Sequence, residues 1–304
     1  MKILNFGSMN IDYVYEMDHI VRGGETLSSF MLKQFCGGKG LNQSVALARA
    51  GANLYHAGCV GTDGSMLTRL LSESGADCSF VRVIDERSGH AIIQVDKNGE
   101  NSIMLYQGAN GQITLEHIDT VLSYFEEDDL ILLQNEINHL DEIIMKAAAK
   151  GLRIAINPSP ISDNIEKLPL DKVTYFLLNE IEGKELTGKE NPDDILKVLR
   201  EKYPESTVVL TLGSKGSIYD DGVVRCAHGI YQVEVVDTTA AGDTFTGYFL
   251  NAITSGISPE ESLRIASKAS ALAVSKMGAA PSIPKMEEVI TAQLELKMSE
   301  YALC

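Results

Sequence analysis

The chain has 304 residues and an acidic composition, with 42 Asp and Glu against 26 Lys and Arg and a formal net charge of −16. This charge argues against nucleic acid as a partner, because phosphate backbones bind to basic surfaces. The longest apolar runs, such as Leu130–Leu133, are far too short to span a bilayer, which argues against a membrane protein. The five cysteines form no CxxC pair, a pattern typical of a reduced, cytoplasmic protein.

Strand-like and helix-like stretches alternate along the chain, which predicts an α/β fold with a mostly parallel sheet and helices on both of its faces. The stretches that read as short buried strands are Ile3–Gly7, Tyr55–Val60, Leu130–Gln134, Arg153–Ile156, Tyr175–Leu178 and Val208–Leu212. The helical patterns include Gly64–Ser74, Leu140–Lys150, Pro192–Lys202 and a capped helix start at Ser258–Glu261. No long linker interrupts the pattern, so we expect one domain over residues 1–304.

Two stretches depart from this alternation. Val14–Phe35 has little helical periodicity, and Gly89–Tyr106 reads as two strands joined by a turn at Lys97–Gly99. An Asn-Gly step between apolar runs is a strong hairpin signal. The residues from about 13 to 36 and from 88 to 108 are therefore expected to form a small β-sheet lid over the main domain, with an ordinary surface hairpin as the alternative.

Polar residues follow the first strand at Gly7–Asp12. Ligands of open α/β sheets bind outside the carboxyl ends of the strands, where the side chains of Asn10 and Asp12 would emerge. Such a pair suits sugar hydroxyls, which both donate and accept hydrogen bonds. A strand-ending turn with an Asx bond is the other interpretation of the same motif.

A glycine-rich segment, Cys36–Gln43, opens the next helix. Its glycines allow close approach of the backbone, and Lys39 and Asn42 offer donors to a polyhydroxylated ligand. The GxxxxGK[ST] spacing of a Walker A loop is absent. Taken alone, the segment is also compatible with a simple tight turn.

Three later segments place polar groups just past predicted strands. Glu136 follows Leu130–Gln134, and Asn179–Glu182 begins a helix after Tyr175–Leu178, where its acids could simply cap the helix. Thr211–Gly216 is a flexible loop after a buried strand. This loop could approach a nucleotide or form a hairpin turn into Ser217–Tyr219.

The most informative segment is Val236–Phe245. A helix is predicted to begin near Gly242, and the small residues before it leave backbone N–H groups uncovered at the positive end of the helix dipole. Asp243 would stand beside any anion bound there. A carboxylate in an anion site suits the removal of a proton from a hydroxyl while phosphate charge builds up nearby, whereas the simpler interpretation is a helix cap.

Together these segments resemble the ribokinase-like (PfkB) carbohydrate kinases, from Lys2 to about Glu288. Asp237–Phe245 is similar to the C-terminal signature of that family and Gly37–Gln43 to its N-terminal signature. The order of the remaining motifs also matches that family. These motifs are Gly24–Thr26, Asn157–Pro160, Asn179–Glu182, Leu212–Gly216 and Gly278–Ser282.

The resemblance implies a Rossmann-like domain with a β-sheet lid that often forms a homodimer, and MgATP-dependent phosphorylation of a primary hydroxyl of a sugar. It assigns Asp243 as general base and the amides of Ala240, Ala241 and Gly242 as anion hole. The sugar residues it implies are Asn10, Asp12, Gly38, Lys39, Asn42, Glu136 and Asp243. The nucleotide residues are Asn179, Glu182, Thr211, Leu212, Gly213, Ser214, Lys215, Gly216 and Gly242. The residues of an activating K⁺ site are Asp237, Thr239, Ala273, Lys276, Gly278 and Ser282.

The acceptor that the resemblance implies first is D-ribose, with ribose 5-phosphate as the product. Two alternatives stay open at this point. One is a kinase of the same fold that acts on a nucleoside, fructose or a deoxy sugar acid. The other is a catalytically silent regulator that binds a sugar or a nucleotide.

Overall fold

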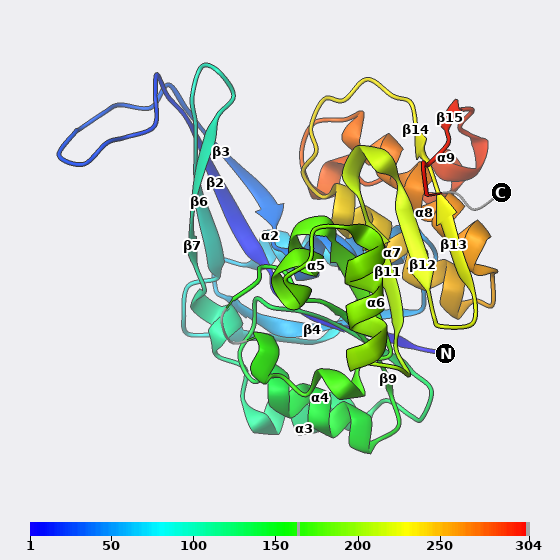
Figure 1. Cartoon of the computed structure of the whole chain (residues 1–304). Coiled ribbons are helices and arrows are strands. Elements are labelled where there is room, and N and C mark those ends of the chain that lie inside the picture. Colours follow the sequence, from blue (N-terminus) through cyan, green and yellow to red (C-terminus); the bar gives the residue numbers. More distant parts are fainter. Residues whose placement is uncertain (163–164, 302–304) are drawn as a thin grey trace.

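The computed structural model describes residues 1–162 and 165–301, and its centre is a nine-stranded sheet (Figure 1). The strands of this sheet are β1 (Ile3–Phe6), β4 (Leu54–Gly61), β5 (Asp77–Ile84), β8 (Leu130–Gln134), β9 (Arg153–Asn157), β10 (Tyr175–Asn179), β11 (Thr207–Thr211), β12 (Ser217–Asp220) and β13 (Arg225–His228). Their order is β13-β12-β11-β10-β9-β8-β1-β4-β5, parallel from β5 to β11 and antiparallel at β12 and β13. The predicted fold class is confirmed, as are all six predicted strands.

Helices cover both faces of this sheet because neighbouring strand residues point to opposite sides. Ile3 and Leu4 in β1 are both buried, but they belong to two different apolar cores. The core around Leu4 is covered by α3 (Leu115–Ser123), α4 (Leu140–Ala149), α5 (Glu180–Thr187) and α6 (Pro192–Lys202). The core around Ile3 is covered by α1 (Lys39–Arg49), α2 (Ser65–Ser74), α7 (Ala241–Thr254), α8 (Pro259–Val274) and α9 (Met286–Thr291).

A separate four-stranded sheet projects from the main body (Figure 1). It consists of β2 (Asn10–Glu16), β3 (Met31–Gly37), β6 (Gly89–Val95) and β7 (Asn101–Tyr106), in the order β3-β2-β6-β7. The predicted hairpin is confirmed: β6 and β7 pair antiparallel, and Gly99 takes the positive φ of 82° that the turn requires. Because β2 begins at Asn10, both Asn10 and Asp12 belong to this second sheet, and the interpretation of this pair as a strand-ending turn is wrong.

The last described residues return to the edge of the main body. β15 (Leu296–Lys297) pairs antiparallel with β14 (Ile230–Tyr231). The Ser299 hydroxyl donates a hydrogen bond of 2.8 Å to the carbonyl oxygen of Lys215. Among the described residues, no helix combines the length and the apolar character needed to cross a membrane.

Candidate active site

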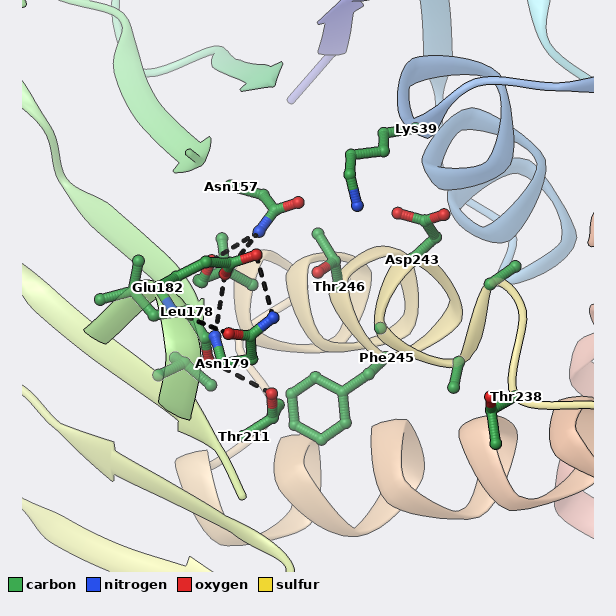
Figure 2. A pocket seen from close by; sticks show the side chains of 15 residues that line it. Lys39, Asn157, Leu178, Asn179, Glu182, Thr211, Thr238, Asp243, Phe245 and Thr246 are labelled. Carbon is green, nitrogen blue, oxygen red and sulfur yellow. Dashed lines mark hydrogen bonds between the residues drawn. The ribbon is translucent and has the colours of Figure 1, made fainter. Parts of the chain in front are cut away.

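The carboxyl ends of the central strands and the start of α7 enclose a cavity of about 230 Å³ (Figure 2). The polar side chains that line it come from segments far apart in the sequence. They are Lys39, Asn157, Asn179, Glu182, Thr211, Thr238, Asp243 and Thr246. A second cavity, of about 740 Å³, shares Thr211, Thr238, Ala241, Gly242 and Phe245 with the first. The parallel strand order brings these segments to one edge of the sheet, as expected for an open α/β fold.

Asp243 lies in the first turn of α7, faces the first cavity and is 8% exposed. Among the described residues, no hydrogen bond joins its side chain to the start of α7. Instead, its Oδ2 accepts a hydrogen bond of 3.0 Å from Asn42 Nδ2, and its Oδ1 accepts one of 2.9 Å from Gln43 Nε2. The interpretation of Asp243 as a plain helix cap is therefore wrong, because its carboxylate is held by α1 and points into the cleft.

The amides at the start of α7 are arranged by an unusual backbone conformation. Ala240 has a φ of 60°, a left-handed value that costs free energy for a residue with a Cβ and is typical of functional turns. The amides of Ala240 and Gly242 donate to no other residue that the structure describes. The Ala241 amide donates to the Thr238 carbonyl oxygen at 3.2 Å, closing a tight turn. The prediction that all three amides are free is wrong for Ala241.

The sugar-side residues lie between β2, α1 and the residues after β8. Glu136 Oε2 accepts a hydrogen bond of 2.9 Å from the Lys39 amide and another from the Ser8 hydroxyl. Asn10 Oδ1 accepts one of 2.7 Å from Asn110 Nδ2. Gly38 caps α1 at a φ of 90°, where a Cβ would lie only 3.0 Å from the Asn10 amide nitrogen. This region therefore brings together Asn10, Glu136 and the start of α1, as the sequence predicts.

Burial raises the pKa of two carboxyl groups on the sugar side of the site, those of Asp12 and Glu136. Burial, followed by the negative charge of Glu136, raises the pKa of Asp12 from 3.8 to about 7. Burial also raises the pKa of Glu136, and the charge of Asp243 adds to this, against the hydrogen bonds from Ser8 and Lys39. The side chain of Asp12 fits because Gly37 has none, since a Cβ there would lie 2.0 Å from Asp12 Oδ2.

We expect Asp12→Asn to stabilise the protein at neutral and higher pH. The folded protein retains a proton on Asp12 between the ordinary pKa of 3.8 and about 7, whereas the unfolded chain releases it, so folding stability falls as pH rises through this window. Asparagine resembles the protonated form and avoids that loss. Urea unfolding should give the variant a free energy of unfolding about 2 kcal/mol higher than wild type at about pH 8, and nearly equal at about pH 4. An equal difference at both pH values would contradict this origin.

On the opposite side of the cavity, Asn179 and Glu182 begin α5 as a reciprocal capping box. Glu182 Oε2 accepts hydrogen bonds from the Asn179 amide at 2.9 Å and from Asn157 Nδ2 at 3.2 Å, and Oε1 accepts one from Asn179 Nδ2 at 3.0 Å. The capping interpretation is thus confirmed, and both side chains also line the cavity. Figure 2 shows them facing Lys39 and Asp243.

The loop after β11 is both a turn and a cavity wall. The loop connects β11 to β12, which pair antiparallel, so the hairpin interpretation is confirmed. The larger cavity is lined by Thr211, Gly213, Ser214 and Gly216. Leu212 and Lys215 do not line it. The side chain of Leu212 packs in the apolar core, and Lys215 Nζ lies 3.6 Å from Glu300 in the C-terminal segment. For these two residues, side-chain contact with a nucleotide is not supported.

The two loops predicted to hold a monovalent cation lie beside the anion hole and are bonded together. Asp237 Oδ1 accepts hydrogen bonds from the Thr239 amide at 2.9 Å and hydroxyl at 2.6 Å, and Oδ2 accepts one of 2.9 Å from the Gly278 amide. Burial alone would raise the pKa of Asp237, but these hydrogen bonds outweigh it and hold the pKa below its usual range. In the loop that contains Gly278, the Ala273 carbonyl oxygen accepts a hydrogen bond from the Lys276 amide, and the Ser282 hydroxyl donates one to the Ala279 carbonyl oxygen. These bonds fix the conformation of that loop.

Thr238 and Thr246 line the cavity without having been predicted as site residues, and so do two residues with hydrogen bonds at the site, Gln43 and Asn157. Gln43 binds Asp243 directly, and Asn157 lies between Gln43 and Glu182. Both stand inside motifs singled out in the sequence. Their amide side chains carry no charge or nucleophile that would mark a functional role, so only their contacts reveal it.

The profile described as pfkB family carbohydrate kinase matches residues 1–286. The chain belongs to the PfkB family of carbohydrate kinases. This PfkB-family chain is 35% identical to a ribokinase of Haemophilus influenzae over 295 residues, which cover 93% of this chain and 95% of the relative. The structure of Arabidopsis thaliana ribokinase complexed with ribose and ATP has a TM-score of 0.84 and 30% identity, covering 95% of this chain and 97% of that one. The ADP complex of Cryptococcus neoformans ribokinase has a TM-score of 0.83 and 32% identity, covering 95% and 98%.

Membership in the PfkB family identifies the chain as an ATP-dependent carbohydrate kinase. The cavity at the carboxyl ends of the central strands, lined by Asp243, is the corresponding candidate active site. The family match stops at residue 286, so β15 and the Ser299 contact to the loop after β11 lie outside it.

Proposed function

We propose that this PfkB-family kinase transfers the γ-phosphoryl group of MgATP to the primary hydroxyl of D-ribose. The single observation that carries the proposal is the position of Asp243, whose carboxylate faces the cavity beside the free amides of Ala240 and Gly242. The ribokinases to which the chain is similar, one of them described with ribose and ATP, support ribose as the acceptor.

In this mechanism, the sugar lies between β2 and α1 with the hydroxyl to be phosphorylated next to Asp243. Asp243 accepts the hydroxyl proton as phosphoryl transfer proceeds. Asn42 Oδ1 is buried and has no hydrogen-bond partner among the described residues, so it is free to accept a hydrogen bond from a sugar hydroxyl. The free amides at the start of α7 stabilise the negative charge that develops on the transferred group.

The nucleotide would occupy the larger cavity with its phosphates toward Gly242. Lys39, which the sequence assigned to the sugar, places its side chain in the cavity shared with Asn179 and Glu182 (Figure 2), so we assign its charge to the phosphates. Mg²⁺ would neutralise part of the phosphate charge. Both carboxylate oxygens of Glu182 already accept hydrogen bonds from amides. We therefore expect Glu182 to contact hydrated Mg²⁺ through a water molecule and not directly.

We further propose that K⁺ binds between the loop of Asp237 and the loop of Gly278. The fit rests on ligand chemistry: the Asp237 carboxylate, whose hydrogen bonds hold its pKa below the usual range, supplies oxygen atoms that suit a hard monovalent cation. A cation there would lie next to the anion hole. Its contribution would be to hold the Thr238–Gly242 turn in position.

The decisive experiment is coupled detection of ADP release with a panel of acceptors, each assayed with and without K⁺. We expect D-ribose to give the highest kcat/KM, and K⁺ to raise kcat relative to Na⁺ at equal ionic strength. Higher kcat/KM for fructose, a nucleoside or a deoxy sugar acid would replace ribose as the substrate. No ADP release with any acceptor would favour a silent binding protein.

We propose that the second sheet acts as the lid and as the contact surface of a homodimer. Its two edge strands, β3 and β7, carry exposed apolar side chains, which mark an interaction surface. The exposed side chains are Met31, Leu32, Ile103, Met104, Leu105 and Tyr106. The described cysteines are all free, which supports a reducing, cytoplasmic location, and the net charge of −16 supports small-molecule partners over nucleic acid.

Met104→Glu should convert the dimer to a monomer, because it places a charge among the exposed apolar side chains of the edge strand β7. Met104 is 62% exposed in the single chain, so the change should not lower the stability of the monomer. Light scattering coupled to size-exclusion chromatography measures the mass directly. Met145→Glu, at a 50% exposed site on α4, is the control and should leave the mass unchanged. A wild-type monomer would exclude the proposed dimer.

A further inference from the structure

A chain of side-chain amides, all buried except the half-buried Asn157, links the candidate base to the interior of the sheet. Its central member is Gln43 in α1, which is 0% exposed. The Nε2 group of Gln43 donates hydrogen bonds of 2.9 Å to Asp243 Oδ1 and 3.1 Å to Asn157 Oδ1. Both hydrogens of this amide are thereby used, and both bonds point to acceptors.

The orientation of this chain is set at one end by the main chain of β10. Asn157 Nδ2 donates a hydrogen bond of 3.0 Å to the Leu177 carbonyl oxygen and one of 3.2 Å to Glu182 Oε2. A carbonyl oxygen can only accept, so Asn157 must turn its nitrogen toward β10. Its oxygen therefore faces Gln43, where it requires a donor.

The other end is set by the main chain of α1. Asn5 Nδ2 donates a hydrogen bond of 2.7 Å to the Gly40 carbonyl oxygen, which again leaves the asparagine oxygen as an acceptor. Gln134 Nε2 donates to that oxygen at 3.0 Å and to Gln43 Oε1 at 2.7 Å. Gln43 thus meets a donor at its oxygen and two acceptors at its nitrogen, and only one orientation of its amide satisfies all three.

We propose that Gln43 is a positioning residue that holds the Asp243 carboxylate in one orientation, aimed at the acceptor hydroxyl. The proposal rests on the function proposed above. Reversing the Gln43 amide would set its oxygen against the carboxylate and against Asn157 Oδ1, an arrangement of buried acceptors without donors. Together with Asn42 on the other oxygen, Gln43 fixes the plane of the carboxylate before substrate arrives.

The chain also joins the two halves of the site. Asn157 contacts Glu182 on the nucleotide side and Gln43 on the sugar side, so α1, β9 and α5 hold the base in a common frame. Amide groups do not titrate, and they therefore hold this geometry over a wide pH range. A carboxylate or a histidine at position 43 would instead gain or lose a proton as the pH changes, and this would alter the charge next to the base.

Gln43→Leu tests the proposal, because leucine has a similar size but no hydrogen-bonding group. We expect kcat for the best acceptor to fall about 10–100-fold, since a charge-assisted hydrogen bond and the aim of the base are lost. The KM for the sugar should change less than about threefold. The low-pH limb of kcat should move to higher pH, because the ionised carboxylate has lost a donor. A merely structural role would not move this limb.

Gln134→Leu provides a second test that leaves every group in contact with Asp243 in place. It removes the donor that orients Gln43 Oε1, together with the hydrogen bond from Gln134 to Asn5 Oδ1. We expect a several-fold loss of kcat in the wild-type background and no further loss in the Gln43→Leu background, because the effect passes through Gln43. Additive losses in the double variant would overturn the proposal, and Gln134→Leu alone still tests it if Gln43→Leu does not fold.

The matched control is Asn251→Ala. Asn251 also ties α7 to α1, through a hydrogen bond of 2.8 Å to the Ala50 carbonyl oxygen, but it does not touch Asp243. It should lower the free energy of unfolding while kcat stays within about twofold of wild type. Equal losses of kcat in Gln43→Leu and Asn251→Ala, or wild-type kcat in Gln43→Leu, would refute the positioning role. An inactive wild-type protein would instead refute the proposed function.

Discussion

Asp243→Asn should abolish sugar-dependent ADP release almost completely, with kcat reduced about 10²–10⁴-fold. The amide cannot accept the hydroxyl proton, whereas the shape of the site is preserved. Asparagine offers only one acceptor oxygen where the carboxylate offers two, so either Asn42 or Gln43 loses a partner. We expect the free energy of unfolding to fall by about 1–2 kcal/mol as a result.

Binding and turnover separate the catalytic role of Asp243 from a structural one. Isothermal titration with D-ribose should give a dissociation constant within a few-fold of wild type, because the other sugar-side groups remain. Asp119→Asn serves as the control, since Asp119 is an exposed carboxylate on α3 that pairs with Lys146. It should retain wild-type kcat. Wild-type turnover in Asp243→Asn would remove the residue from the role of base.

Gly40→Ala should disrupt both the fold and the activity. Gly40 lies in the first turn of α1, where a Cβ would sit 2.3 Å from the Ser8 amide nitrogen and 2.6 Å from the Gly7 carbonyl carbon. These are backbone atoms that cannot rotate away, so α1 must shift from the end of β1. We expect urea unfolding to show a loss of about 3 kcal/mol.

The same shift should lower kcat by at least about 100-fold, because α1 carries the two donors to Asp243. Gly23→Ala is the control. Gly23 has an ordinary φ and no atom within 4 Å of its added Cβ, so its substitution should change neither stability nor kcat. If Gly40→Ala kept wild-type stability, the close contact between α1 and β1 would not be essential.

The parts of the fold with strong local signals were predictable from the sequence. Continuous apolar runs marked the buried parallel strands, and Asn98-Gly99 marked the turn between β6 and β7. The outer strands β5 and β13 escaped prediction. β5 lies at an edge of the sheet and alternates exposed with half-buried residues, so its apolar pattern is weak.

The candidate site was predictable where its chemistry is local. The exposed amides before α7 and the carboxylate of Asp243 belong to a single turn, so their types and spacing already indicate an anion site beside a base. The side chains of Leu212 and Lys215 do not line the larger cavity, because their neighbours lie far away in the chain. One packs into the core, and the other turns toward the C-terminal segment.

By itself, the sequence determined the alternation of strands and helices, the glycine-rich turns, the net negative charge and the reactive groups of each motif. These are properties of short segments, set by backbone preferences and side-chain chemistry. Only the tertiary structure decided that Gln43 and Asp243, 200 residues apart, share a hydrogen bond, and that Asn157 connects them to Glu182. The direction of a buried polar side chain depends on which donors and acceptors other elements bring within about 3 Å, and that distance exists only once the helices and strands that carry them are packed together.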